Sequence, residues 1–89
     1  MERAIILNNI RSVYNVGSIF RTADASGVSK IYLVGITPTP TDRFGRKRKD
    51  FAKVALGAEE SVIWQYSKDI FPVIENLREE GFKIVAVEQ

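Results

Sequence analysis

Residues 8–27 read NNIRSVYNVGSIFRTADASG, and this segment organises the rest of the chain. Its polar start is followed by apolar residues spaced three and four apart, which is the spacing of one face of a helix. Asn15 is a good helix N-cap and Gly27 stands where a glycine ends a helix, so we predict a helix over residues 16–26. The apolar face that would pack on the core consists of Val16, Ile19, Phe20 and Ala23.

Short apolar runs on both sides of this helix predict the strands of a sheet. The alternation of strand and helix along the chain favours an α/β fold with a mainly parallel sheet and flanking helices. The predicted strands occupy residues 4–7, 30–34, 62–66 and 82–87, and the further predicted helices occupy residues 51–57 and 70–80.

The last predicted strand has nothing after it to cover it. Parallel sheets are normally covered on both faces, and two substantial helices are too few to cover four strands. Exposed apolar surface of this kind usually marks an interface. We therefore predict a homo-oligomer, most simply a twofold dimer, and we interpret Trp64 and Tyr66 as core or interface residues.

The composition limits the possible chemistry. A chain of 89 residues predicts a single domain, residues 1–89. It has no cysteine and no histidine, which removes disulfides, Cys or His nucleophiles and the common zinc sites, so we expect no metal. No apolar run approaches the roughly 18 residues that span a membrane, and the start does not resemble a secretion signal. The cytoplasm is the expected location.

The positive charge of the chain is concentrated in one segment. Residues 43–53 hold six of the 13 basic residues but only one of the 11 acids, Asp50, whereas the rest of the chain is mildly acidic. A dense basic patch is typical of phosphate contact, and Phe44 and Phe51 could stack on bases. The alternative is a solvated loop with incidental charge. The candidate RNA-binding residues are Arg43, Arg46, Lys47, Arg48, Lys49 and Lys53.

The side of the first helix opposite its apolar face has a distinct composition. Gly17, Arg21 and Ala25 stand four residues apart on one line, so small residues flank a long guanidinium. Another helix, or a ligand with phosphate or hydroxyl oxygens, could approach such a face closely. Asn15 adds a donor and an acceptor beside the positive end of the helix dipole. The alternative is an ordinary capped helix with a solvated arginine.

These residues also carry a resemblance to a known family. The triplets NVG (residues 15–17) and RTA (residues 21–23), followed by Gly27, resemble the first motif of the SpoU/TrmH family of RNA ribose 2′-O-methyltransferases, in the SPOUT superfamily. Residues 53–59, KVALGAE, resemble the lysine and glycine-alanine segment of many members. The likeness covers essentially the whole chain.

The resemblance implies transfer of a methyl group from S-adenosylmethionine to a ribose 2′-hydroxyl of tRNA or rRNA. It implies a domain with a Rossmann-like sheet, whose C-terminal part is tied in a trefoil knot. The resemblance further implies that the enzyme works as a homodimer. It also assigns the catalytic role to Arg21, with Asn15 in support. An arginine is too weak a base to remove the hydroxyl proton, so it would stabilise the developing alkoxide or hold the adjacent phosphate.

The second and third motifs of the family, which build the knot and hold the cofactor, would follow the last strand, and the sequence stops at Gln89 before either. We therefore interpret the chain as the N-terminal half of such a domain, without a cofactor site, and expect it alone to be inactive. Two alternatives are a non-catalytic RNA-binding or assembly module derived from the family and a plain α/β interaction domain.

Overall fold

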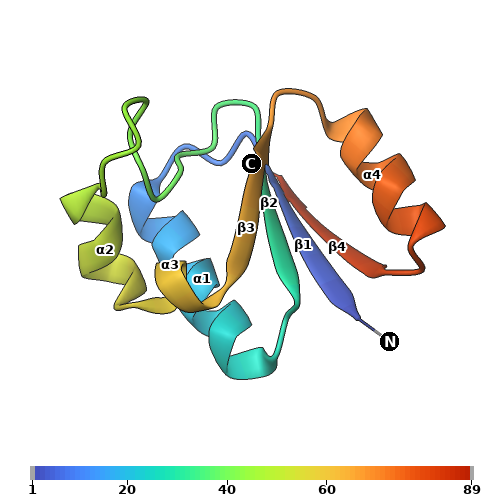
Figure 1. Ribbon diagram of the computed structural model, residues 1–89, viewed down its shortest axis with the longest axis horizontal. Helices are drawn as coiled ribbons and strands as arrows, with labels where there is room; N and C mark the ends of the chain where they lie inside the picture. Colours follow the sequence, from blue (N-terminus) through green and yellow to red (C-terminus); the bar gives the residue numbers. More distant parts are fainter. Residues whose placement is uncertain (1, 89) are drawn as a thin grey trace.

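A computed structural model describes residues 2–88, which form one four-stranded sheet with helices on both faces (Figure 1). All three strand pairs are parallel, and the strand order is β3-β2-β1-β4. The predicted α/β fold with a parallel sheet is therefore confirmed. The strands are β1 (Arg3–Asn8), β2 (Lys30–Val34), β3 (Ile63–Ser67) and β4 (Lys83–Glu88), and the helices are α1 (Val13–Ser26), α2 (Lys49–Ala55), α3 (Ala58–Ser61) and α4 (Ile70–Glu79).

The sheet separates two apolar layers. Helices α1, α2 and α3 cover one face and α4 lies alone on the other (Figure 1). Alternate side chains of each strand point to opposite faces, so Leu7 packs toward α1 while Ile6 packs toward α4. In the α1 layer the rings of Phe20 and Phe51 meet edge to face, with centroids 5.2 Å apart.

Helix α1 begins earlier than its pattern predicts. Ser12 is the N-cap, and its hydroxyl accepts a hydrogen bond of 3.1 Å from the backbone N–H of Asn15. The prediction that Asn15 caps the helix is therefore wrong, because two good capping residues lie three positions apart and the first one is used. Asn15 is instead an exposed residue of the first turn. The predicted end is confirmed, since Gly27 closes the helix in the left-handed conformation, with φ of 71°.

The line of small residues on α1 is only partly open. Gly17 is buried against α2, and a Cβ placed on it would lie 2.9 Å from both Cβ and Cγ1 of Val54. The expectation of an open face is thus wrong at Gly17, where a helix of the same chain already makes the close contact. Arg21 and Ala25, further along the line, are exposed.

The remaining elements differ from prediction mainly at their ends. Helix α2 begins at Lys49, two residues before its predicted start, and the short helix α3 was not predicted at all. Only β2 has the predicted bounds. Pattern reasoning misses α3 because four residues cannot show a helical period.

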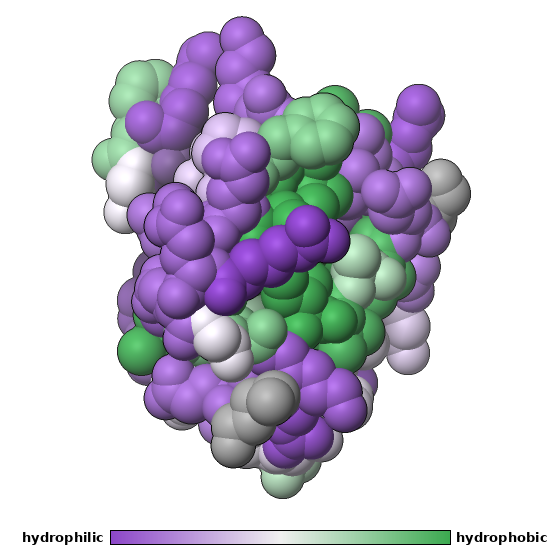
Figure 2. Space-filling model, turned by 90° about the vertical axis from the view of Figure 1, so that its right-hand side faces the viewer, coloured by the Kyte–Doolittle hydropathy of each residue, from purple (hydrophilic) through white to green (hydrophobic). Residues whose placement is uncertain are grey.

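Part of the sheet lacks cover, as predicted. On the α1 face, Val85 of β4 is 48 % exposed and borders a hollow of about 350 Å³, whereas Ile84 packs under α4 on the opposite face. The α4 face also carries exposed apolar side chains, Ile63 of β3 and Phe71 of α4. Figure 2 views the molecule from the α4 side and shows hydrophobic surface lying open between hydrophilic side chains.

Candidate nucleic-acid interface

The loops that follow β1 and β2 meet at the carboxyl edge of the sheet, where parallel α/β sheets bind their ligands. Buried Thr37 joins them: its hydroxyl accepts a hydrogen bond of 3.1 Å from the Ile10 N–H and lies within 2.9 Å of two strand carbonyls, to one of which it donates. Asn9 Oδ1 accepts from the N–H of Ile36 at 3.1 Å. A Cβ on Gly35 would lie 2.0 Å from that oxygen, so this position requires glycine. These hydrogen bonds fix the loop after β1 and the loop after β2 relative to one another.

The basic segment forms a hydrogen-bonded turn rather than an irregular loop. We call residues 41–48 the basic hairpin, because Thr41 and Lys47 form an antiparallel bridge. Asp42 organises the turn: its Oδ1 accepts from the N–H groups of Phe44 at 2.8 Å and Arg46 at 3.0 Å. The Arg46 N–H bond is the main reason that the pKa of the Asp42 carboxyl lies below its usual value.

The charge of the basic hairpin is partly neutralised by nearby acids. Arg46 pairs with Asp42 at 3.2 Å, Arg48 pairs with Asp50 at 2.8 Å, and Lys47 pairs with Glu60 of α3. The hydrogen bond from Lys47 lowers the pKa of Glu60. Among residues 2–88, no carboxylate lies within ion-pair distance of the three remaining predicted contacts, which are Arg43, Lys49 and Lys53; all three are exposed.

The two phenylalanines of this segment have different environments. Phe44 is 68 % exposed at the tip of the basic hairpin, and the guanidinium carbons of Arg43 and Arg46 lie 5.0 and 5.1 Å from its ring centroid. Phe51 is fully buried against Phe20. The expectation that Phe51 stacks on bases is therefore wrong, because its place on α2 faces the core.

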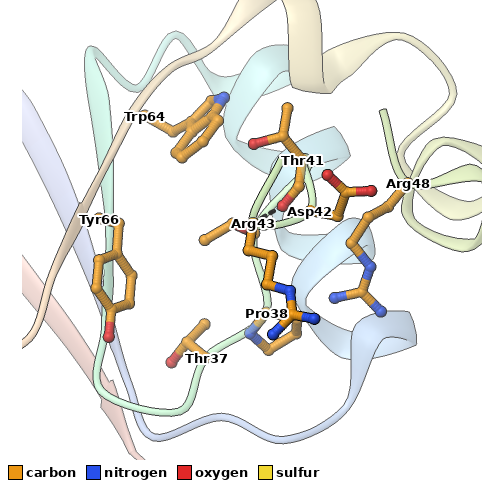
Figure 3. A pocket seen from close by; sticks show the side chains of 9 residues that line it. Thr37, Pro38, Thr41, Asp42, Arg43, Arg48, Trp64 and Tyr66 are labelled. Carbon is orange, nitrogen blue, oxygen red and sulfur yellow. Dashed lines mark hydrogen bonds between the residues drawn. The ribbon is translucent and has the colours of Figure 1, made fainter. Parts of the chain in front are cut away.

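An open cleft of about 610 Å³ lies between β3 and the loop that follows β2 (Figure 3). Trp64 and Tyr66 project into it from β3, at alternate positions on the same face of the sheet. Trp64 also packs against the core, as predicted, whereas Tyr66 is 47 % exposed and donates its hydroxyl to the Gly35 carbonyl at 2.9 Å. We define the aromatic cleft by all of its lining residues, Thr37, Pro38, Thr39, Thr41, Asp42, Arg43, Arg48, Trp64 and Tyr66.

The aromatic cleft is the part of the site that sequence analysis missed. The alternation of Trp64 and Tyr66 within a strand is a signal that both side chains share one face. The strand's place at the edge of the sheet, and the loop that forms the other wall, are set by the tertiary structure alone.

The two residues of the first motif occupy different surroundings. Arg21 is exposed, and among residues 2–88 its guanidinium has no hydrogen-bond or ion-pair partner. Asn15 lies six residues earlier, about 9 Å along the helix axis. It lines a separate hollow of about 290 Å³ together with Ser18 and the end of β4, and within residues 2–88 the buried hydroxyl of Ser18 has no hydrogen-bond partner. Asn15 and Arg21 therefore share one helix but do not line one hollow.

Other classes of site receive no support from the part of the chain that is described. Residues 2–88 contain no group of three or more acidic, cysteine or histidine side chains arranged to hold a metal ion. Over the same residues, no helix is both long enough and apolar enough to span a membrane.

The fold and the site define a parallel α/β domain that presents a basic hairpin and an exposed arginine on its first helix. Comparison with known proteins gives the particular family: the model of the SpoU rRNA Methylase family matches residues 2–89, and the chain belongs to that family.

Relatives of the chain occur in staphylococci, each with a name that assigns it to the TrmH family of tRNA/rRNA methyltransferases. The chain is 31 % identical over 88 residues to the Staphylococcus saprophyticus protein and 30 % identical over 88 residues to that of Staphylococcus haemolyticus. Each match covers 99 % of the chain. Identity to the Staphylococcus epidermidis protein is 33 % over 84 residues, or 94 % of the chain. The chain spans about one third of the length of these relatives.

Proposed function

We propose that this chain is the RNA-binding and arginine-bearing part of an enzyme that methylates a ribose 2′-hydroxyl of tRNA or rRNA. The observation that carries the proposal is Arg21, which lies in the motif that resembles the family's first signature and is exposed with no partner among residues 2–88. A guanidinium left without a protein partner is available to an anionic substrate. The exposed basic side chains of the basic hairpin, Arg43, Arg46 and Lys47, supply further phosphate contacts.

The proposed role of Arg21 follows from its chemistry. Its pKa stays above about 12, so it remains a hydrogen-bond donor and does not remove the hydroxyl proton. It would stabilise the negative charge that develops on the ribose oxygen, or hold the neighbouring phosphate through paired hydrogen bonds. Asn15 is exposed on the same helix and would orient the substrate with its amide.

S-adenosylmethionine supplies the methyl group when it is bound, but the described residues do not fit it. The hollow beside Asn15 has about 290 Å³, just under the usual range of roughly 300 to 1,000 Å³ for ligand pockets. The hollow beside Val85 has about 350 Å³, but its lining within residues 2–88 includes Arg3 and contains no carboxylate to hold the sulfonium or the amino group of the cofactor.

The aromatic cleft is larger, but Arg43, which has no carboxylate partner among residues 2–88, lines it and would repel the sulfonium. Asp42 also lines the cleft, but its carboxylate is already bonded to Arg46 and to the backbone of the basic hairpin. We therefore propose that residues 1–89 alone neither bind the cofactor nor transfer a methyl group.

RNA binding is the direct test. Fluorescence anisotropy would measure the affinity of the chain for labelled tRNA and rRNA fragments at several salt concentrations. We expect weak binding that falls steeply with salt, because each neutralised phosphate releases counterions. A variant with Gln at positions 43, 46, 47, 48 and 49 should bind more weakly but melt at nearly the same temperature, since exposed ion pairs contribute little. No binding of the wild-type chain at low salt would refute the proposal.

A second candidate is a non-catalytic RNA-binding or assembly module derived from the same family. The poor fit of the described residues to S-adenosylmethionine is compatible with both functions, so cofactor binding in the assembled protein has to separate them. Calorimetric titration with the cofactor, in the presence of a companion chain that carries the remaining motifs, separates the two functions. Binding with one site per chain supports the enzyme, and its absence supports the module. In either case we propose a homo-oligomer that acts in the cytoplasm.

A further inference from the structure

The two walls of the aromatic cleft have different chemistry (Figure 3). The β3 wall presents the rings of Trp64 and Tyr66, and the opposite wall carries Pro38 and the guanidinium of Arg43. Apolar rings opposite a cation form a surface that suits a group with a flat apolar part and a negative part.

The charge that faces the aromatic cleft is available to a ligand. Arg43 is exposed, and among residues 2–88 it has no carboxylate partner. Its guanidinium carbon lies 5.0 Å from the centroid of the Phe44 ring, and this contact leaves the N–H groups open to an anion. Asp42 also lines the cleft, but its carboxylate already accepts hydrogen bonds from the backbone of Phe44 and from Arg46.

The two rings of the β3 wall are held in place but still present surface to the cleft. Trp64 is half buried and held by its packing, so its indole is fixed in place. Tyr66 keeps 47 % of its surface exposed, and its hydroxyl is tied to Gly35, which fixes the ring at the edge of the sheet. A rigid exposed ring loses little conformational freedom when another ring stacks on it.

We propose that the aromatic cleft binds one unstacked nucleotide of the RNA, with its base against Tyr66 and Trp64 and its phosphate at Arg43. This inference rests on the proposed RNA-binding function and adds a base-recognising subsite to it. Single-stranded RNA is commonly held by stacking on aromatic rings beside a basic groove. The volume of the cleft, about 610 Å³, lies within the range of roughly 300 to 1,000 Å³ that is usual for small-molecule pockets.

The experiment uses two eight-unit probes with the same number of phosphates, an oligoadenylate RNA and its abasic counterpart. Trp64 is the single tryptophan of the chain, so its fluorescence reports on the cleft. We expect the oligoadenylate to quench this fluorescence and to bind about tenfold more tightly than the abasic probe, as one stacked base contributes on that scale. The abasic probe should leave the fluorescence nearly unchanged.

Two variants locate the stacking surface. Tyr66→Leu should reduce oligoadenylate affinity about tenfold without changing affinity for the abasic probe. Tyr66→Phe keeps the ring but loses its hydroxyl bond to Gly35, so it should retain more affinity than Tyr66→Leu. Phe71→Leu is the matched control, because Phe71 is an exposed aromatic residue of α4, which covers the other face of the sheet (Figure 1). Phe44→Leu tests the alternative that the base stacks on the basic hairpin, since Phe44 is exposed there and does not line the cleft. Circular dichroism checks that each variant is folded.

The outcomes separate this inference from the proposed function. If both probes bind equally and in a salt-dependent way, the RNA-binding function stands and the nucleotide subsite is wrong. If Phe44→Leu weakens binding and Tyr66→Leu does not, the base stacks on the basic hairpin and the subsite is again wrong. If neither probe nor any larger RNA binds, both proposals fail.

Discussion

Substitution of Gly17 by alanine tests how closely α1 and α2 pack. The added Cβ would lie 2.9 Å from Cβ and Cγ1 of Val54 and 3.3 Å from the backbone nitrogen of Ala55. Carbon atoms prefer separations of about 3.5 to 4.0 Å, so one helix must shift. Overpacking of this kind costs about 1 to 3 kcal/mol.

A second term opposes this cost. Alanine is favoured over glycine in a helix interior by about 0.5 to 1 kcal/mol. The net expectation for Gly17→Ala is a loss of about 1 kcal/mol in the free energy of unfolding. For a domain of this size such a loss lowers the melting temperature by about 4 to 8 °C.

Urea and thermal unfolding followed by circular dichroism measure the effect, and two controls isolate it. Ala25→Gly, at an exposed position on the same line of α1, measures the helix-propensity term away from the α1–α2 contact. In a Val54→Ala background, the cost of Gly17→Ala should fall by about 0.5 kcal/mol or more, because the two side chains then compete less for space. If Gly17→Ala instead raised the free energy of unfolding by about 0.5 to 1 kcal/mol, the whole helix-propensity gain of alanine, the close α1–α2 contact would be refuted.

Four further predictions follow from individual residues. Arg21→Ala should change the free energy of unfolding by less than about 1 kcal/mol, as exposed substitutions do, but should abolish turnover in a full-length enzyme that carries this segment; a strongly destabilised yet active variant would show a structural role. The carboxyl of Asp42 should titrate by carbon NMR below 3.8, its usual pKa, so that its support of the basic hairpin is complete above that pH and is lost as the pH falls through the lowered pKa; a midpoint above 3.8 would contradict the hydrogen bonds assigned to it. Leu56 is 70 % exposed with φ of 54°, so Leu56→Asn should raise the free energy of unfolding by up to about 1 kcal/mol, and a lower melting temperature would show that the leucine side chain matters more than its strained backbone. Light scattering should show a homo-oligomer, because Val85 leaves apolar surface open on β4, and a chain that stays monomeric at about 100 μM with the Val85 amide protected from exchange would contradict it.

Local patterns in the sequence determined the kinds of element and their order. The period of apolar residues separates strands from helices, and it placed β2 at its observed bounds. Gly27 marked the end of α1, because only glycine adopts a left-handed conformation without cost. The concentration of positive charge in residues 43–53 was equally plain from composition. These features depend on residues that are close together in the chain.

The tertiary structure alone decided which surfaces meet. In the folded chain Ser12, and not Asn15, is the N-cap of α1. Helix α2 packs on Gly17, and the side chain of Phe51 lies in the core. Lys47 pairs with Glu60, which lies 13 residues further along the chain. Because of this pair, the net positive charge of the basic hairpin is lower than a count of its basic residues suggests.

The aromatic cleft depends in the same way on distant segments, since Pro38 and Trp64 come from opposite walls. A periodic pattern states which side of an element is apolar, but it contains no information about which neighbour will cover that side. The physical reason is that packing and charge pairing depend on distances in space, which a one-dimensional period does not specify.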